Sequence, residues 1–81
     1  MDSEVFKKEI ERQKSGARAR RQKSIDIVSG DVHRSVGGYP GTNHRMPVCC
    51  SVMYSMMQGA DEILYAPPKG KGATLKIRYH L

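Results

Sequence analysis

The sequence predicts a small α+β fold in which helices precede a C-terminal β-hairpin. Apolar residues recur at helical spacing near the start of the chain and again between His44 and Gln58. Residues 73–81 alternate instead, which is typical of a half-buried strand; one face carries Leu75, Ile77, Tyr79 and Leu81, and the other carries Thr74, Lys76, Arg78 and His80. A chain of 81 residues forms one domain at most.

The first 24 residues form a basic segment, with eight Lys and Arg residues against four acidic ones. Ser3 is an expected N-cap, and Val5, Phe6 and Ile10 give an apolar stripe at helical spacing. Gly16 weakens the middle, so we expect one interrupted helix or a short helix followed by a basic arm. The apolar stripe is a candidate homodimer interface, or it packs on the core of residues 25–81.

Residues 24–28 predict a short strand, because Ile25, Ile27 and Val28 are β-branched. Ser29 is the expected cap of a second helix over residues 30–36, which Gly37 and Gly38 terminate. This helix would bury the i, i+4 pair Val32 and Val36.

A Gly- and Pro-rich turn over residues 37–42 precedes the third helix, for which Asn43 is the expected cap. The helix is predicted from His44 to Gln58, with Pro47 in the first turn and Gly59 as the stop. Its apolar stripe comprises Met46, Cys49, Val52, Met53 and Met56.

The last third of the chain predicts a hairpin with a basic loop. One strand is expected over residues 62–66, the loop over residues 67–72 and the returning strand over residues 73–80. Lys69 and Lys71 alternate with Gly70 and Gly72 in this loop, with no acidic neighbour. The loop is not a nucleotide-binding P-loop, since the GxxxxGK[ST] spacing is absent.

This order of helix, short strand, helix, helix, strand, loop and strand resembles the winged-helix branch of the helix-turn-helix DNA-binding superfamily. The resemblance covers nearly the whole chain and rests on the order of elements rather than on an invariant motif. It implies that the helix from His44 to Gln58 enters the major groove of DNA. Arg45 would then read a guanine and Asn43 an adenine, with His44 and Ser51 on the same surface. The alternatives are a simple helix cap for Asn43 and a solvated charge for Arg45.

The net charge of +6, from 14 Lys and Arg against 8 Asp and Glu, favours a polyanion: nucleic acid first, then an anionic membrane surface. The resemblance makes duplex DNA the expected partner, with the loop lysines on the phosphate backbone or minor groove. A solvated charge run is the alternative for the basic segment. The predicted DNA-binding residues are Arg18, Arg20, Arg21, Lys23, Asn43, His44, Arg45, Ser51, Lys69 and Lys71.

We expect no catalytic activity, no cofactor and no metal. Asp31 and His33 followed by Asn43 and His44 are only a weak match to a metal-nuclease pattern, and His33 is expected to lie at the surface or at an interface. A zinc site is not expected either, because adjacent cysteines point to different faces of a helix. Cys49 and Cys50 rarely bridge each other in a regular backbone, so both are expected as free thiols.

The charged N-terminus and the lack of a long apolar run predict an intracellular, cytoplasmic protein that does not enter a membrane. The competing hypothesis is a winged helix used for protein–protein contact, or an accessory subunit of a larger restriction- or phage-type complex. Basic residues lining one face would favour DNA, whereas Val48, Tyr54 and Met57 on that face would favour protein. Transcription regulator, mobile-element protein and restriction-system module all remain open roles.

Overall fold

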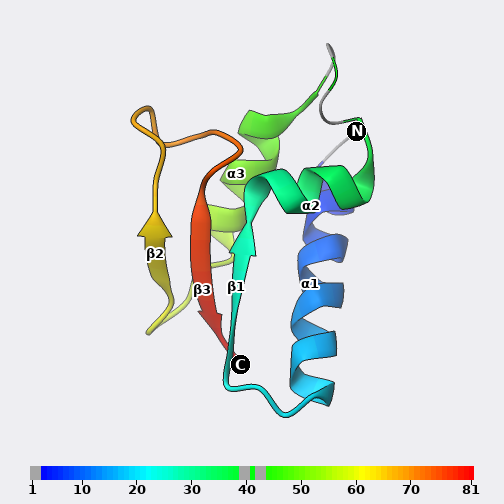
Figure 1. The fold of residues 1–81 in the computed structure, drawn as a ribbon, viewed down its shortest axis with the longest axis vertical. Coiled ribbons are helices and arrows are strands. Elements are labelled where there is room, and N and C mark those ends of the chain that lie inside the picture. The colour runs from blue at the N-terminus through cyan, green and yellow to red at the C-terminus, as the bar shows by residue number, and fades with distance from the viewer. Residues whose placement is uncertain (1–2, 39–40, 42–43) are drawn as a thin grey trace.

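The computed structural model describes residues 3–38, 41 and 44–81 (Figure 1). Within this part of the chain there are three helices and a three-stranded antiparallel sheet, in the order α1 (Ser3–Ala19), β1 (Ser24–Val28), α2 (Ser29–Val36), α3 (Met46–Ser55), β2 (Glu62–Tyr65) and β3 (Lys76–His80). The strand order is β1-β3-β2. The predicted α+β class is confirmed, and the arrangement is compatible with the winged-helix order.

The core lies between the helices and one face of the sheet. Its fully buried side chains come from every helix, from the two longer strands and from the residue just before β3: Phe6, Ile10, Ile27, Val32, Cys49, Cys50, Met53, Leu75, Ile77 and Tyr79. The Tyr79 hydroxyl donates a hydrogen bond to the Met53 carbonyl at 2.7 Å, which ties β3 to α3. Burial of apolar surface between the helices and the sheet is the main stabilising contribution to so small a domain.

Helix α1 runs without interruption through Gly16, so the predicted break in the middle of the basic segment is wrong. Its buried positions are Phe6, Ile10 and Ala17, which pack against α2 and α3. Tertiary packing of this stripe outweighs the lower helix propensity of one glycine. Because Phe6 and Ile10 are fully buried in the protein's own core, the stripe is not a free dimer interface; Val5 is 37% exposed.

Strand β1 has the predicted bounds, and α2 begins directly after it. The Ser29 side chain does not cap α2 as predicted; its hydroxyl donates instead to the Gly72 carbonyl in the loop before β3. Gly30 lies so close to that loop that a Cβ would meet the Ala73 carbonyl oxygen at 2.9 Å. The start of α2 is therefore packed directly against the β2–β3 connection.

Helix α3 is shorter than the predicted helix from His44 to Gln58. Its cap position is Arg45 rather than Asn43, which lies outside the described residues. Pro47 stands in the first turn as expected, where the missing N–H costs no intrahelical bond. The predicted apolar stripe is buried except for half-buried Met56, and Cys50 is buried as well.

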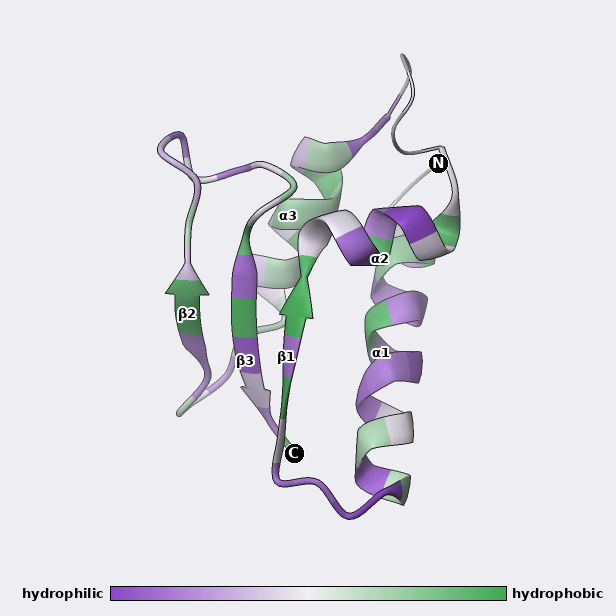
Figure 2. Ribbon diagram, viewed as in Figure 1, coloured by the Kyte–Doolittle hydropathy of each residue, from purple (hydrophilic) through white to green (hydrophobic). Residues whose placement is uncertain are grey.

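Strand β3 alternates hydrophobic and hydrophilic residues along its length (Figure 2). Leu75, Ile77 and Tyr79 face the core as predicted, although the regular strand begins only at Lys76. On the outer face Arg78 stands between its cross-strand partners Asp26 and Glu62. Strand β2 is exposed along its whole length and has an irregular register between Ile63 and Tyr65.

Candidate nucleic-acid interface

The connection between β2 and β3, residues 66–75, is here called the wing loop, and it is held in place rather than free. The Gly70 N–H donates to the Pro67 carbonyl at 2.8 Å and closes a turn, with Gly70 at a φ of 82° that suits glycine. From α3, the Tyr54 hydroxyl donates to the Gly70 carbonyl, and the Cys50 thiol donates to the Gly72 carbonyl at 3.2 Å. The loop therefore presents its lysines from an ordered backbone.

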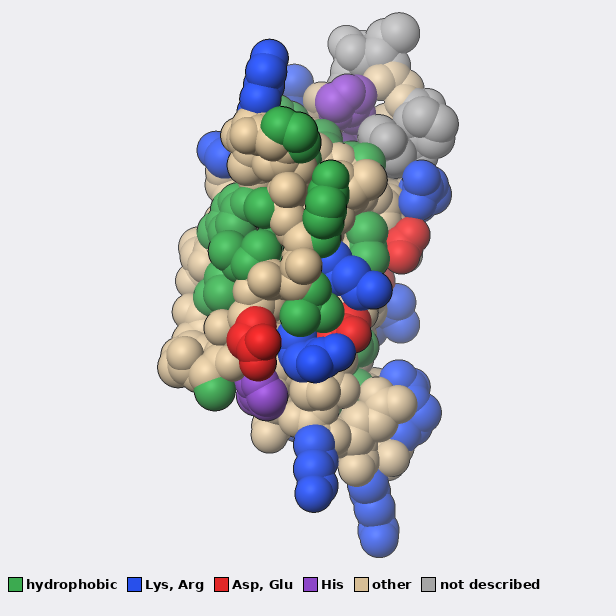
Figure 3. Space-filling view, turned by 60° about the vertical axis from the view of Figure 1, so that its left-hand side comes forward, with side chains coloured by type: hydrophobic (Ala, Val, Ile, Leu, Met, Phe, Trp, Pro, Cys, Tyr) green, Lys and Arg blue, Asp and Glu red, His purple; other side chains and the backbone are tan. Residues whose placement is uncertain are grey.

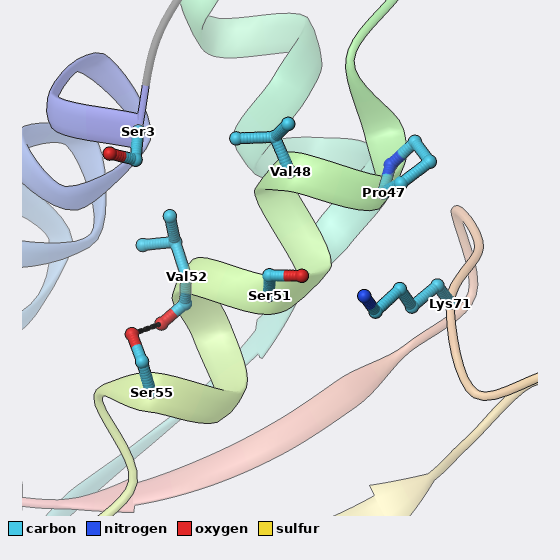
Figure 4. A pocket seen from close by; sticks show the side chains of 7 residues that line it. All are labelled: Ser3, Pro47, Val48, Ser51, Val52, Ser55 and Lys71. Atoms are coloured by element: carbon cyan, nitrogen blue, oxygen red, sulfur yellow. Dashed lines mark hydrogen bonds between the residues drawn. The ribbon is translucent and has the colours of Figure 1, made fainter.

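An open groove of about 470 Å³ lies between the start of α1, the exposed side of α3 and the wing loop. Figure 4 shows Lys71 extending from the loop toward α3 across this groove. The described residues that line the groove include no carboxylate: they are Ser3, Pro47, Val48, Ser51, Val52, Ser55 and Lys71. The groove is thus shallow, most of its lining side chains are small, and Lys71 makes one edge basic.

Helix α3 itself carries no charged residue between Met46 and Ser55. Ser51 is exposed, as a base-reading residue must be. Ser55 is exposed as well, but its hydroxyl already donates to the Val52 carbonyl at 2.8 Å. His44 and Arg45 are exposed and precede the helix rather than lying on it, and the His44 ring accepts the Met46 N–H at 3.2 Å. The exposed side of α3 therefore offers short side chains rather than long hydrogen-bonding ones.

His33 is fully buried, so the expectation of a surface or interface histidine is wrong. Its Nε2 accepts the Arg45 backbone N–H at 2.9 Å, which leaves Nδ1 to donate to the Gly37 carbonyl at 3.1 Å. The ring also meets Phe6 edge-on, with centroids 4.9 Å apart. His33 thereby fixes the residue that caps α3 against the end of α2; nothing in the local sequence distinguishes it from an exposed histidine.

Cys49 and Cys50 are free, fully buried thiols, as expected for reduced cysteines on a helix. Burial, with a smaller contribution from Cys50, raises the pKa of Cys49 to about 12, so its thiolate is not available near neutral pH. Cys49 donates to the Ser29 carbonyl at 3.6 Å. Among the described residues no group of three His, Cys, Asp or Glu side chains could hold a metal ion.

The basic residues fall into paired and unpaired sets. Arg12, Arg34 and Arg78 form ion pairs with Glu9, Asp31 and Asp26 at 2.7–3.0 Å. The predicted DNA-binding cations are all exposed, and the described part of the chain offers them no ion pair: Arg18, Arg20, Arg21, Lys23, Arg45, Lys69 and Lys71. Their charge is thus not neutralised within the described fold and is available to an anionic partner.

These unpaired cations lie in two groups at opposite ends of the molecule, whose longest extent is 37 Å (Figure 1). The wing-end cations, Arg45, Lys69 and Lys71, belong to the end where α3 begins and the wing loop folds against it. The turn cations, Arg18, Arg20, Arg21 and Lys23, belong to the last turn of α1 and its connection to β1. Figure 3 likewise shows Lys and Arg side chains at both ends of the long axis. The structure therefore does not bring all predicted contacts together.

The turn cations follow a regular helix-terminating motif. The Arg21 N–H donates to the Arg18 carbonyl at 2.9 Å and the Gln22 N–H to the Ala17 carbonyl at 3.0 Å, which is the Schellman pattern. Arg21 has a φ of 61°, a left-handed conformation usually taken by glycine at this position. For a residue with a Cβ this conformation costs roughly 1–2 kcal/mol.

None of the described helices is both long enough and apolar enough to cross a membrane. Comparison with known proteins gives no matching family model, no matching curated protein and no matching solved structure. The candidate interface therefore stands on the fold, the groove and the unpaired cations alone.

Proposed function

We propose that this protein binds duplex DNA through its wing end, with the groove beside α3 against the duplex and the wing loop on the phosphate backbone. The observation that carries the proposal is the set of wing-end cations, which are exposed and without an ion pair in the described structure, beside a groove whose described lining has no carboxylate. Unpaired Lys and Arg that displace counterions from phosphates supply most of the non-specific affinity of DNA-binding proteins.

The fixed wing loop supports this proposal. Lys69 and Lys71 leave a backbone that Tyr54, Cys50 and Ser29 hold by hydrogen bonds. A cation on such a backbone loses less conformational freedom on binding than one on a free loop, which favours affinity. The alternation of lysine and glycine also lets a phosphate approach the loop closely.

The short side chains on α3 define the kind of binding. Ser51 and Ser55 carry the exposed hydroxyls of α3 on this face, and the Ser55 hydroxyl donates to the Val52 carbonyl. Pro47 and Val48 offer apolar contact only. Such a face fits a groove closely but discriminates weakly among bases. We therefore expect backbone contacts to dominate, and Arg45, just before the helix, to supply what base preference there is.

The test is duplex binding as a function of salt, with a labelled random-sequence duplex and a single-stranded control. Affinity should fall steeply between about 50 and 200 mM salt. Lys69→Ala/Lys71→Ala should weaken binding to all duplexes alike and reduce the salt slope by about two.

Lys7→Ala/Lys8→Ala is the matched control, because it removes two exposed positive charges from α1 instead of the wing loop. It should leave the affinity near that of the wild-type protein. Equal losses in both double variants would mean that net charge alone drives binding, and no binding at low salt would reject the proposal.

A second candidate function, contact with another protein chain, is favoured by strand β2. Its Ile63, Leu64 and Tyr65 are 46%, 37% and 53% exposed, and Figure 3 shows hydrophobic side chains on the face that carries this strand. Val48, Tyr54 and Met57, which would have indicated a protein-binding face, are half-buried, and Tyr54 is bonded to the wing loop. Sedimentation at increasing concentration, with Leu64→Lys as the variant, tests for self-association through β2.

A further inference from the structure

The turn cations project from a backbone that is ordered on both sides. The Schellman hydrogen bonds of Arg21 and Gln22 close the end of α1, and the Leu81 N–H donates to the Lys23 carbonyl at 2.9 Å. The C-terminal residue of the described chain thus pins the turn before β1 begins. These side chains are accordingly presented by a fixed turn and not by a frayed helix end.

The positive charge at this turn exceeds what the helix requires. A helix C-terminus carries the equivalent of roughly half a negative charge, which one Lys or Arg is enough to balance. Here four basic residues fall within six positions, Arg18 to Lys23, and the sequence has no acidic residue from Gln13 to Ile25. Balancing the partial charge at the end of α1 therefore does not account for the cluster.

The backbone conformation of Arg21 is an independent indication that the turn cations serve a ligand. Its left-handed conformation favours glycine, which would close the same Schellman turn without strain. The chain instead has an arginine there, exposed and without an ion pair among the described residues. An arginine at this exposed position strains the backbone where glycine would not, and it supplies a planar donor group suited to phosphate.

The turn cations also lie too far from the wing end to share its groove. Helix α1 begins at Ser3, which lines the groove with Lys71, and its 17 residues carry the chain about 25 Å away at 1.5 Å per residue. The major groove of B-DNA is about 12 Å wide. The two groups therefore do not enter one stretch of major groove, and a duplex that crosses the long axis of the molecule at the wing end leaves the turn cations free.

We propose that the turn cations form a second phosphate-binding site, which takes the backbone of another duplex, so that one molecule bridges two duplexes. This inference rests on the proposed DNA binding at the wing end. It assigns the two basic ends to two separate DNA segments instead of one continuous surface.

The experiment captures a fluorescent duplex on beads that carry a second, biotinylated duplex, with protein at limiting concentration. Binding to a single duplex is measured in parallel by anisotropy. Wild-type protein and Lys7→Ala/Lys8→Ala should both retain the fluorescent duplex. Arg20→Ala/Arg21→Gly should lose at least five-fold of this capture while its affinity for a single duplex falls by less than three-fold. Its urea midpoint should be no lower than that of the wild-type protein, since glycine suits the turn.

Each outcome separates the two claims. Capture by Arg20→Ala/Arg21→Gly at the level of the control would overturn the second site and assign bridging to paired copies of the protein. Wild-type binding to a single duplex without capture would also overturn it, yet leave the wing-end proposal standing. If the wild-type protein bound no duplex at all, the proposed function itself would fail, and this inference with it.

Discussion

At the scale of single residues, His33 links the core to the candidate interface. Both of its ring nitrogens are used: one accepts the Arg45 N–H at the start of α3, and the other donates to the Gly37 carbonyl after α2. Because the first nitrogen must be an acceptor, the neutral ring with its proton on Nδ1 is the form that fits this site. A residue without hydrogen-bonding atoms would make neither of these two bonds.

We predict that His33→Leu destabilises the protein by roughly 1–3 kcal/mol, since it removes two hydrogen bonds of a fully buried ring to part-buried backbone groups. The measurement is urea unfolding followed by circular dichroism. His80→Leu is the matched control, because His80 lies on the exposed outer face of β3 and should change stability little. Equal effects of the two substitutions would show that the His33 hydrogen bonds do not matter for the fold.

At the scale of elements, a row of oppositely charged side chains joins the three strands across the outer face of the sheet. Arg78 on β3 donates to both carboxylate oxygens of Asp26 on β1, at 2.8 and 3.1 Å, while Glu62 on β2 stands on its other side. Hydrogen bonding from the Arg78 guanidinium holds the pKa of Asp26 below its usual range. The ionised carboxylate is therefore favoured in the folded state.

A lowered folded-state pKa predicts a contribution to stability that is present above the unfolded pKa of about 3.9 and lost as the pH falls through the folded value. Asp26→Asn should accordingly lower the urea midpoint at pH 7, by less than a core substitution because the pair is partly exposed. The difference from wild type should shrink as the pH is taken well below 4. A difference that stayed constant from pH 7 to pH 2 would contradict this origin.

The elements also show which parts of the fold local sequence could predict. The sequence predicts strand β1 at its observed bounds, because the β-branched residues there agree with their tertiary setting. The predicted start of α3 is two residues early, because Asn43 is a better cap by type than Arg45. The His33 bond to the Arg45 N–H is a long-range contact. Ser29 is likewise a cap by residue type, but its hydroxyl donates to the carbonyl of Gly72 in the wing loop, 43 positions along the chain. Such contacts leave no local signal.

At the scale of the whole molecule, the predicted site divides along the long axis. The cations that the sequence predicts as DNA contacts are exposed, but sequence alone cannot show that α1 separates Arg18, Arg20, Arg21 and Lys23 from the wing end. Net charge is a property of the chain, while its placement depends on how α1 and the sheet pack. The same packing leaves Arg45, at the cap position directly before α3, as an exposed residue with a long hydrogen-bonding side chain.

For the proposed DNA binding, this placement predicts little base discrimination, concentrated at one position. Arg45→Ala should weaken binding to the preferred duplex, selected from a random library, by about 1–3 kcal/mol and weaken binding to random duplexes much less. Arg18→Ala is the matched control: it removes one exposed charge at the opposite end and should affect all sequences equally. If Arg45→Ala also affected all sequences equally, Arg45 would be a phosphate contact, and the protein would bind DNA by charge and shape alone.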